Sequence, residues 1–431
     1  MSANLWAANS PQAFWQLDAS IDEETWGLAI ARAAPVLGLP CEPQDVGDLL
    51  QMTLGEGQFG PRHFALPAAK RLYYRFKPVL PRCSTNIVRR VYGRAQVRLS
   101  RLEWPCENRY PLFLLGVIRE LLEQTGLHEL RYRHFWPGGA EFALVLTHDV
   151  ETAAGMQYVR AVADLDESYG FRSSFNLVTE SYPLDRHLLQ DLEHRGFEVG
   201  VHGIKHDGRL FLSPQVFAQR AERINEWLAE LGAVGFRAPF TMRHPEWMQA
   251  LRIEYDSSFF DTDPYQPVSG GTMCLWPFFL GHFVELPYTL SQDCVLVRLR
   301  RETTPETWLR KVDMLSRYGG MALVNSHPDY LCSPACRRVY EEFLREMAER
   351  VGCWHALPRD VARWWKQRAS GQGNDATWGT LAIGHDGEIL LDRNPACPLR
   401  FAGPPVADEA KEMEEPPSGS GPRSSAVVSS E

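Results

Sequence analysis

Apolar positions in the first third of the chain follow a helical spacing. In the segments TWGLAIARAAPVL and PLFLLGVIRELLEQTG, apolar residues recur every three or four positions, which is the period of an amphipathic helix. The pattern predicts a mainly helical N-terminal region over residues 1–138.

The pattern changes near residue 141. Short apolar or alternating runs are now each followed by a helical pattern, which is typical of strand-helix units around a parallel sheet. Helices are clearest at 214–231 and 305–318, where Ser213 and Thr304 are expected as N-caps before a first-turn proline. Seven strands are expected, at 142–149, 174–178, 198–202, 235–238, 254–257, 283–287 and 321–326. We therefore expect an α/β barrel of seven or eight strands.

The C-terminal sequence divides into two parts. The segment WGTLAIGHDGEILLD predicts a hairpin that turns at His385, Asp386 and Gly387, within an extension over residues 370–403. Residues 404–431 are rich in Pro, Ser, Gly and Glu, a composition that predicts disorder.

Composition and charge exclude some classes of protein. The 431 residues are 44% apolar and 23% charged, as in an ordinary globular protein, and suffice for two domains or one extended barrel. The net charge of -9 argues against nucleic acid as a partner, because such proteins usually carry a basic excess.

Cysteines and the N-terminus bear on location. The nine cysteines include no CxxC pair, which fits a reduced, intracellular chain. The N-terminus has neither the basic start nor the apolar core of a secretory signal, and no apolar run approaches the roughly 20 residues of a membrane span. We expect a cytoplasmic protein.

Two histidines, His202 and His206 in VGVHGIKHD, have a spacing that can hold a metal ion. Such a short motif also arises by chance, and two unrelated histidines are the simpler explanation. The location shifts the balance, because the pair begins at the carboxyl end of a predicted strand, where barrel enzymes assemble their sites.

The segment LTHDVE supplies carboxylates at the end of another predicted strand. Alternate residues of a strand share a face, so Asp149 and Glu151 point one way and His148 points the other. One acid can complete a metal site with the two histidines, while the other takes a proton from water. The alternative is a solvated acidic pair, and His148 is interpreted as a packing or second-layer residue.

Three further strand ends carry polar groups. Arg237 in GFRAPF can hold the carboxylate base in a bidentate ion pair, and His327 in LVNSHPDY can act as a general acid. Asp256 in EYDSSFFDTD can orient a histidine, although Asp261 and Asp263 are equally available. Each also fits a structural role: a surface arginine, a core histidine and a turn aspartate.

Together, THDVE, HGIKH, RAPF, YDSS and LVNSH resemble the five ordered motifs of the polysaccharide deacetylases, carbohydrate esterase family four. That family includes chitin, chitooligosaccharide and peptidoglycan deacetylases. The resemblance spans residues 142–330, under half of the chain, and does not extend to the N-terminal region. It implies a distorted (β/α)7 barrel over residues 139–369.

The resemblance also implies roles for single residues. Asp149 would be the catalytic base held by Arg237, His327 the general acid, and His202 and His206 ligands of a divalent ion, with zinc expected and cobalt or manganese as alternatives.

Two more positions follow from the same resemblance. The backbone amide of Phe240 would bind the oxyanion. Many members read TFDDG, whose second Asp is the metal ligand, whereas Val150 occupies that position here. Other members place the ligand one residue later, and the strand-face argument independently selects Glu151.

The implied activity is removal of N-acetyl groups from an amino sugar in a polysaccharide, an oligosaccharide or a lipid-linked glycan. One alternative is a hydrolase on the same scaffold that acts on a different carbon-nitrogen bond, with or without a metal. Another is a catalytically silent carbohydrate-binding module, although the complete set of catalytic residue types argues against it.

A basic, aromatic stretch lies upstream of the barrel. Between Glu56 and Glu103 there are eleven Lys and Arg and no acidic residue, with Tyr73, Tyr74 and Phe76 interleaved. A solvated helical face is the simpler interpretation. The functional hypothesis is that residues 70–101 contact an anionic membrane surface or a lipid-pyrophosphate glycan, which would place the enzyme at the inner face of the membrane.

Overall fold

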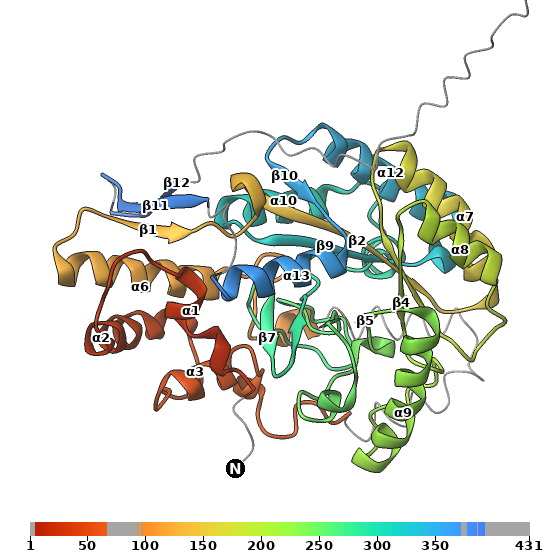
Figure 1. The fold of residues 1–431 in the computed structure, drawn as a ribbon, viewed down its shortest axis with the longest axis horizontal. Coiled ribbons are helices and arrows are strands. Elements are labelled where there is room, and N and C mark those ends of the chain that lie inside the picture. The colour runs from red at the N-terminus through yellow and green to blue at the C-terminus, as the bar shows by residue number, and fades with distance from the viewer. Residues whose placement is uncertain (1–4, 67–92, 94–95, 372–376, 386, 393–431) are drawn as a thin grey trace, which may run out of the picture. The chain divides into compact units, whose positions relative to one another are not determined.

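A strongly curled sheet is the central feature of the computed structural model, and all seven predicted strands belong to it (Figure 1). The structure describes residues 5–66, 93, 96–371, 377–385 and 387–392. The predicted strands are observed as β2 (Phe142–Val150), β3 (Ser174–Leu177), β4 (Glu198–Val201), β5 (Gly235–Phe236), β6 (Tyr255–Asp256), β8 (Phe283–Glu285) and β9 (Met321–Ser326). Two strands that were not predicted, β7 (Phe278–Leu280) and β10 (Cys353–His355), complete it.

The strand order is β10-β2-β3-β4-β5-β6-β8-β7. Strand β9 also pairs with β2. All of these pairs are parallel except the β7 and β8 hairpin. The segment that follows β8 contacts β9 through an isolated parallel β-bridge between Leu290 and Val324. The expected α/β barrel is thus confirmed as an open, curled half-barrel, whose parallel strands end at one common edge.

Strand β2 runs through the core of the molecule. All nine of its residues are buried, and its apolar first half fits a strand covered on both faces, as parallel sheets require. Polar residues appear only in its second half, where Thr147, His148 and Asp149 approach the common edge. The strand therefore carries polar groups to the place where sites form in such folds.

Helices connect the strands and cover the sheet: α7 (Ala153–Ser168), α8 (Arg186–His194), α9 (Pro214–Leu231), α10 (Glu306–Tyr318), α11 (Pro328–Leu331), α12 (Pro334–Glu349) and α13 (Pro358–Ala369). Ser213 caps α9 as predicted, since its side chain accepts a hydrogen bond from the amide of Val216. The predicted cap at Thr304 is wrong. Pro305 itself takes the N-cap position of α10, and its ring provides no acceptor.

Short helical turns occur in the connecting segments: η1 (Ala7–Asn9), η2 (Ala34–Leu37), η3 (Gly57–Phe59), η5 (Pro137–Gly139), η6 (Pro239–Thr241) and η7 (Trp247–Ala250). The segment Cys294–Leu299 forms a π-helix, a rare conformation that is frequent at functional sites.

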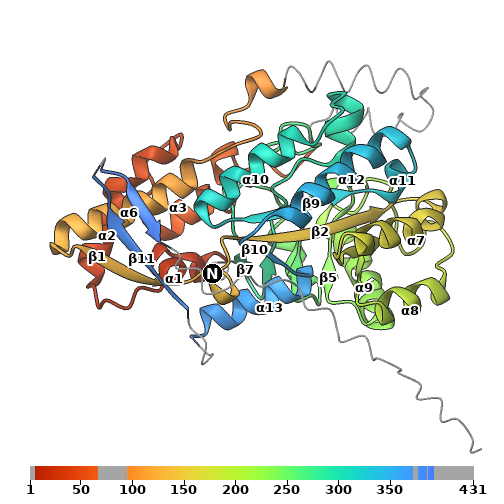
Figure 2. The ribbon, with the colours of Figure 1, turned by 90° about the horizontal axis from the view of Figure 1, so that it is seen from above.

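The N-terminal region is mainly helical, as expected, with α1 (Pro11–Trp15), α2 (Glu23–Ala33), α3 (Val46–Met52) and α6 (Arg109–Thr125). The predicted C-terminal hairpin is present as β11 (Trp378–Ile383) and β12 (Ile389–Asp392). Strand β1 (Glu129–Arg133), which was not predicted, pairs antiparallel with β11. Figure 2 shows α2, α6, β1 and β11 lying together.

Some predictions lie outside the described residues. These are the disorder of residues 404–431 and most of the basic stretch proposed to contact a membrane, residues 70–101. None of the helices that the structure describes combines the length and apolar character needed to cross a bilayer.

Candidate metal centre

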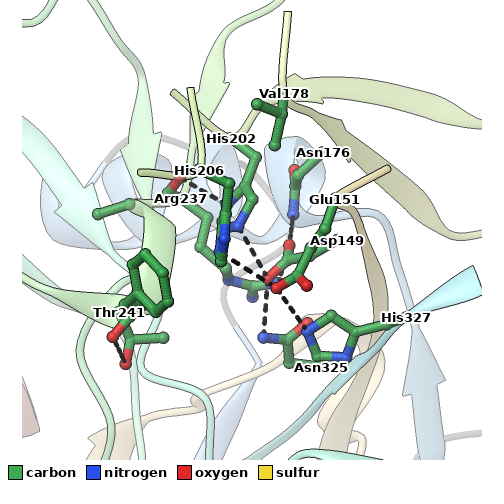
Figure 3. Close-up of polar contacts among 12 residues, drawn as sticks. Asp149, Glu151, Asn176, Val178, His202, His206, Arg237, Thr241, Asn325 and His327 are labelled. Carbon is green, nitrogen blue, oxygen red and sulfur yellow. Dashed lines mark hydrogen bonds and ion pairs between the residues drawn. The ribbon is translucent and has the colours of Figure 1, made fainter. Parts of the chain in front are cut away.

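Residues from four parallel strands converge at the common edge of the sheet (Figure 3). Asp149 lies near the end of β2 and Glu151 follows it directly, while His202 follows β4. Arg237 follows β5 and His327 follows β9. Neighbouring parallel strands end side by side, so residues far apart in the sequence meet here.

Glu151, His202 and His206 offer ligand atoms that all lie within 4.8 Å of one another. Nε2 of His206 is 3.1 Å from Oε1 of Glu151 and forms an ion pair with it. A cation held among these groups would bind the carboxylate and both imidazoles together. Two imidazoles and one carboxylate form a donor set that suits zinc or a similar divalent ion and leaves coordination positions open.

His202 is prepared for the role of ligand. Its Nδ1 lies 2.9 Å from the carbonyl oxygen of Arg237, and donation there leaves the Nε2 lone pair free. Burial lowers the pKa of His202 to about 4, against the opposing charge of Asp149. The ring is therefore neutral near pH 7, which is the form that binds metal ions.

Asp149 is held from three directions. Its Oδ1 accepts hydrogen bonds from Nδ2 of Asn176 at 2.9 Å and from Nη1 of Arg237 at 3.1 Å, and its Oδ2 accepts one from Nδ2 of Asn325 at 2.9 Å. Burial alone would raise the pKa of Asp149, but His202 and the Arg237 guanidinium outweigh it and hold the pKa well below its ordinary value. The carboxylate is thus ionised and fixed in orientation.

The pairing of Arg237 with Asp149 was predicted as bidentate, but only Nη1 donates to the carboxylate, because Nε donates to the carbonyl of Ser257. The two asparagines were not predicted. Both lie inside buried strands, and Asn176 stands opposite Asp149 in the register of β2 and β3. An asparagine within an apolar strand was the available signal, because a buried amide requires a polar partner.

His327 has a carboxylate partner that sequence analysis missed. Its Nδ1 is 2.7 Å from Oδ1 of Asp293, and its backbone amide donates to Oδ2 of the same residue at 3.0 Å. Nε2 of His327 faces the centre, 3.8 Å from Oε1 of Glu151. Burial would lower the pKa of His327, but Asp293 outweighs burial and raises it to about 9.

Asp256, considered as an orienting acid, lies elsewhere. Its carboxylate accepts hydrogen bonds from the amide and hydroxyl of Ser258, and the structure pairs it with no imidazole among the described residues. Asp261 and Asp263 also have other partners, Lys311 and Tyr288 respectively. The orienting position belongs to Asp293, whose sequence context carries no distinguishing motif.

Phe240 lies beside the candidate ligands. Its backbone has a left-handed φ of 60°, which is uncommon for a bulky residue and costs free energy. Its ring centroid is 4.0 Å from that of His206. Contact with His206 follows from this geometry, and the role of its amide stays a prediction.

The comparisons with known proteins give matches in structure only. No protein-family model and no curated protein matches the sequence. About half of the chain matches solved structures of polysaccharide deacetylases at low sequence identity. One is a Mycobacterium smegmatis protein assigned as a polysaccharide deacetylase (19% identical, 54% of this chain and 93% of that chain, TM-score 0.41). Another is the peptidoglycan deacetylase PdaC from Bacillus subtilis (12% identical, 55% of this chain and 96% of that chain, TM-score 0.37). The allantoinase PuuE also matches (14% identical, 54% of this chain and 93% of that chain, TM-score 0.45).

Proposed function

We propose that this protein is a divalent-metal-dependent hydrolase that removes N-acetyl groups from an amino sugar in a polysaccharide, an oligosaccharide or a lipid-linked glycan. The observation that carries the proposal is the convergence of Glu151, His202 and His206. This group lies beside an ionised carboxylate, Asp149, and a histidine held by its own carboxylate, His327.

Hydrolysis of an amide needs an activated water, a stabilised oxyanion and a proton for the leaving nitrogen. A divalent cation held by Glu151, His202 and His206 would polarise the carbonyl and increase the acidity of water. Asp149 accepts the proton of the attacking water at Oδ2, the oxygen with a single hydrogen bond from Asn325. Arg237 and Asn176 hold the other oxygen, so the carboxylate does not rotate away.

His327 supplies the proton for the leaving nitrogen. Because Nδ1 is engaged with Asp293, the proton on Nε2 is the one directed into the site. A pKa raised to about 9 keeps the imidazole protonated near pH 7, as a general acid requires. The backbone amide of Phe240, whose ring lies beside that of His206, donates to the oxyanion.

The sequence supports an N-acetylated sugar as the substrate. The five segments that resemble polysaccharide deacetylase motifs contain all of the proposed catalytic residues and ligands. They also contain Asn325, whereas Asp293 and Asn176 lie outside them. A carbohydrate with an acetamido group is the substrate that this resemblance implies.

Acetate release tests the proposal. Protein purified without chelator and supplied with zinc or cobalt is offered a panel of N-acetylated oligosaccharides and lipid-linked sugars, with Asp149→Asn as the matched control. We expect acetate from at least one substrate and a rate lower by about 10²–10⁴ in the variant, since both forms keep nearly the same shape.

Two outcomes contradict the proposal. Release of ammonia or another amine product without acetate would identify a hydrolase for a different carbon-nitrogen bond. Binding of glycans without any product, in protein that contains metal, would identify a silent carbohydrate-binding module.

A further inference from the structure

The peptide bond between Val150 and Glu151 is held on both sides, by a residue from a loop and a residue from a short helix. Its carbonyl oxygen, on Val150, accepts a hydrogen bond from the hydroxyl of Tyr182 at 2.6 Å. Its N–H, on Glu151, donates to Oδ2 of Asp329 at 3.0 Å. Tyr182 lies in the loop between β3 and α8, and Asp329 lies in α11 directly after His327.

Each of the two residues has a second bond that fixes it in turn. The hydroxyl oxygen of Tyr182 accepts from the amide of Val178 at 3.2 Å, so the ring ties the end of β2 to the end of β3. The other carboxylate oxygen of Asp329 accepts from the hydroxyl of Thr152, the residue that caps α7. Tyr182 is buried, so water does not readily replace its hydrogen bonds.

Gly155 leaves the space that Asp329 occupies. A Cβ atom on Gly155 would lie 2.2 Å from Oδ2 of Asp329, the oxygen that accepts from the Glu151 amide. A carboxylate on so short a side chain cannot move away without losing that bond. The absence of a side chain at Gly155 is therefore part of the same arrangement.

This geometry matters because Glu151 lies one residue beyond β2. Within the described part of the chain, the one backbone–backbone hydrogen bond of this peptide is a long one, 3.4 Å from the amide of Val178 to the carbonyl of Val150. His202, in contrast, is fixed by its own ring bond to the carbonyl of Arg237. Without a comparable restraint, the backbone that carries Glu151 would have to be ordered when an ion binds, at a cost in affinity.

We infer that Tyr182 and Asp329 are positioning residues, a peptide clamp that holds Glu151 where it meets His202 and His206 and so sets the affinity of the site for a divalent ion. This inference rests on the proposed function, since it takes Glu151 as a ligand. The clamp also bears on the distance between His327 and Glu151. His327 directly precedes α11, which provides Asp329, and its Nε2 is 3.8 Å from Oε1 of Glu151.

Zinc affinity tests the clamp directly. The dissociation constant is measured for the full chain by competition with a chromogenic chelator at one pH, and the thermal midpoint of each metal-free protein is recorded. We expect about a 10-fold weaker affinity in Tyr182→Phe and in Asp329→Ala, within the 10- to 100-fold range known for partners of metal ligands. Asp329→Asn should restore much of it, because its amide oxygen still accepts from Glu151 and its amide NH₂ can donate to Thr152.

Gly155→Ala offers an independent test, because it leaves every hydrogen-bonding group in place and displaces Asp329 by contact alone. It should weaken zinc binding to a similar extent. Should Asp329→Ala fail to fold, Tyr182→Phe and Gly155→Ala still decide the question.

Two matched controls separate positioning from general destabilisation. Tyr255→Phe removes a buried hydroxyl that donates to Oε1 of Glu198 at 2.9 Å. Asp45→Ala removes the N-cap side chain of α3, whose Oδ1 accepts from the amide of Asp48 at 2.8 Å. Both should lower the thermal midpoint and leave the zinc dissociation constant within about twofold.

The outcomes distinguish the clamp from the proposed function. If the wild-type chain binds no zinc, the proposed function fails. If it binds zinc and the clamp variants bind equally well, or the controls lose as much affinity as they do, the inference is overturned and the proposed function stands.

Discussion

The two faces of the sheet at the ends of β2 and β9 both carry histidine and aspartate. On one face these side chains hydrogen-bond to one another, and on the other they lie at the candidate metal centre. On the back face, His148, Ser326 and Asp166 form a buried chain: Nδ1 of His148 is 2.7 Å from Oγ of Ser326, and its Nε2 is 2.9 Å from Oδ2 of Asp166. Ser173 and Tyr340 donate to Asp166 at 2.7 and 2.8 Å. On the front face, next in sequence, Asp149 and His327 belong to the candidate metal centre.

The back face shows that the residue types alone do not make a site. Serine, histidine and aspartate occur there in hydrogen-bonded order, but all three are fully buried and each ring nitrogen of the histidine has a partner. On the front face, Nη2 of Arg237 has no hydrogen-bond partner among the residues that the structure describes, and the ligand atoms of Glu151, His202 and His206 all lie within 4.8 Å of one another. Satisfied polar groups stabilise a fold, whereas converging unsatisfied ones are available to a ligand.

The largest expected effect is on the front face, at His327. Replacing it by Gln should lower kcat/KM for an N-acetylated sugar by about 10²–10⁴, because the leaving nitrogen loses its proton donor. With 4-nitrophenyl acetate, whose leaving group needs no proton, the loss should be much smaller. Steady-state kinetics on both substrates check this, and equal losses on the two would show that His327 has no acid role.

A third buried cluster should behave like the back face, and it gives the next largest effect. Arg243 donates to both oxygens of Glu56, and its Nη1 donates to the carbonyls of Thr241 and Val268 at 3.1 and 3.3 Å. Removing one partner of such a buried pair typically costs about 3–5 kcal/mol. We expect Glu56→Gln to lower the free energy of unfolding by about 3 kcal/mol at pH 7 and to leave zinc binding unchanged.

The same pair gives a dependence on pH. Burial would raise the pKa of Glu56, but Arg243 outweighs it and lowers the pKa from 4.5 to about 2. A carboxyl whose pKa is depressed by folding contributes its full stability above its unfolded pKa and loses it as pH falls. Urea titrations should therefore show the gap between wild type and Glu56→Gln shrinking from pH 5 toward pH 2, and a constant gap would contradict this account.

Much of the fold and part of the site followed from local pattern. Seven strands were marked by apolar runs, and the period of a strand placed Asp149 and Glu151 on one side of β2. Convergence of His202 with Glu151 was expected because both follow parallel strands, whose ends share one edge. These inferences needed only periodicity and topology.

The remainder depends on tertiary pairing, which no local pattern encodes. Asp293, the N-cap of the π-helix, contacts His327 from 34 residues earlier in the sequence. Asn325 donates to Asp149 across 176 residues. Asp256, the acid chosen from its motif, bonds instead to Ser258 two residues away, since a nearby hydroxyl and amide satisfy it locally. The pairing of β1 with β11 was not foreseen either, because it joins segments far apart in the sequence.

The smallest expected effect is on the back face. Ser326→Ala removes the partner of Nδ1 of His148, and a buried polar group left without a partner costs about 1–3 kcal/mol. We expect the free energy of unfolding to fall by about 1–2 kcal/mol, while zinc affinity and acetate release stay unchanged. A loss of either, with the fold intact, would show that the two faces are not separate in function.

Metal content tests the central claim most directly. Wild-type protein and the His202→Ala, His206→Ala double variant are dialysed against zinc, and the bound metal is measured by elemental analysis, with circular dichroism to confirm that both are folded. The account predicts about one zinc ion per wild-type chain and none above background in the variant. Equal zinc in both proteins, or none in either, would contradict it.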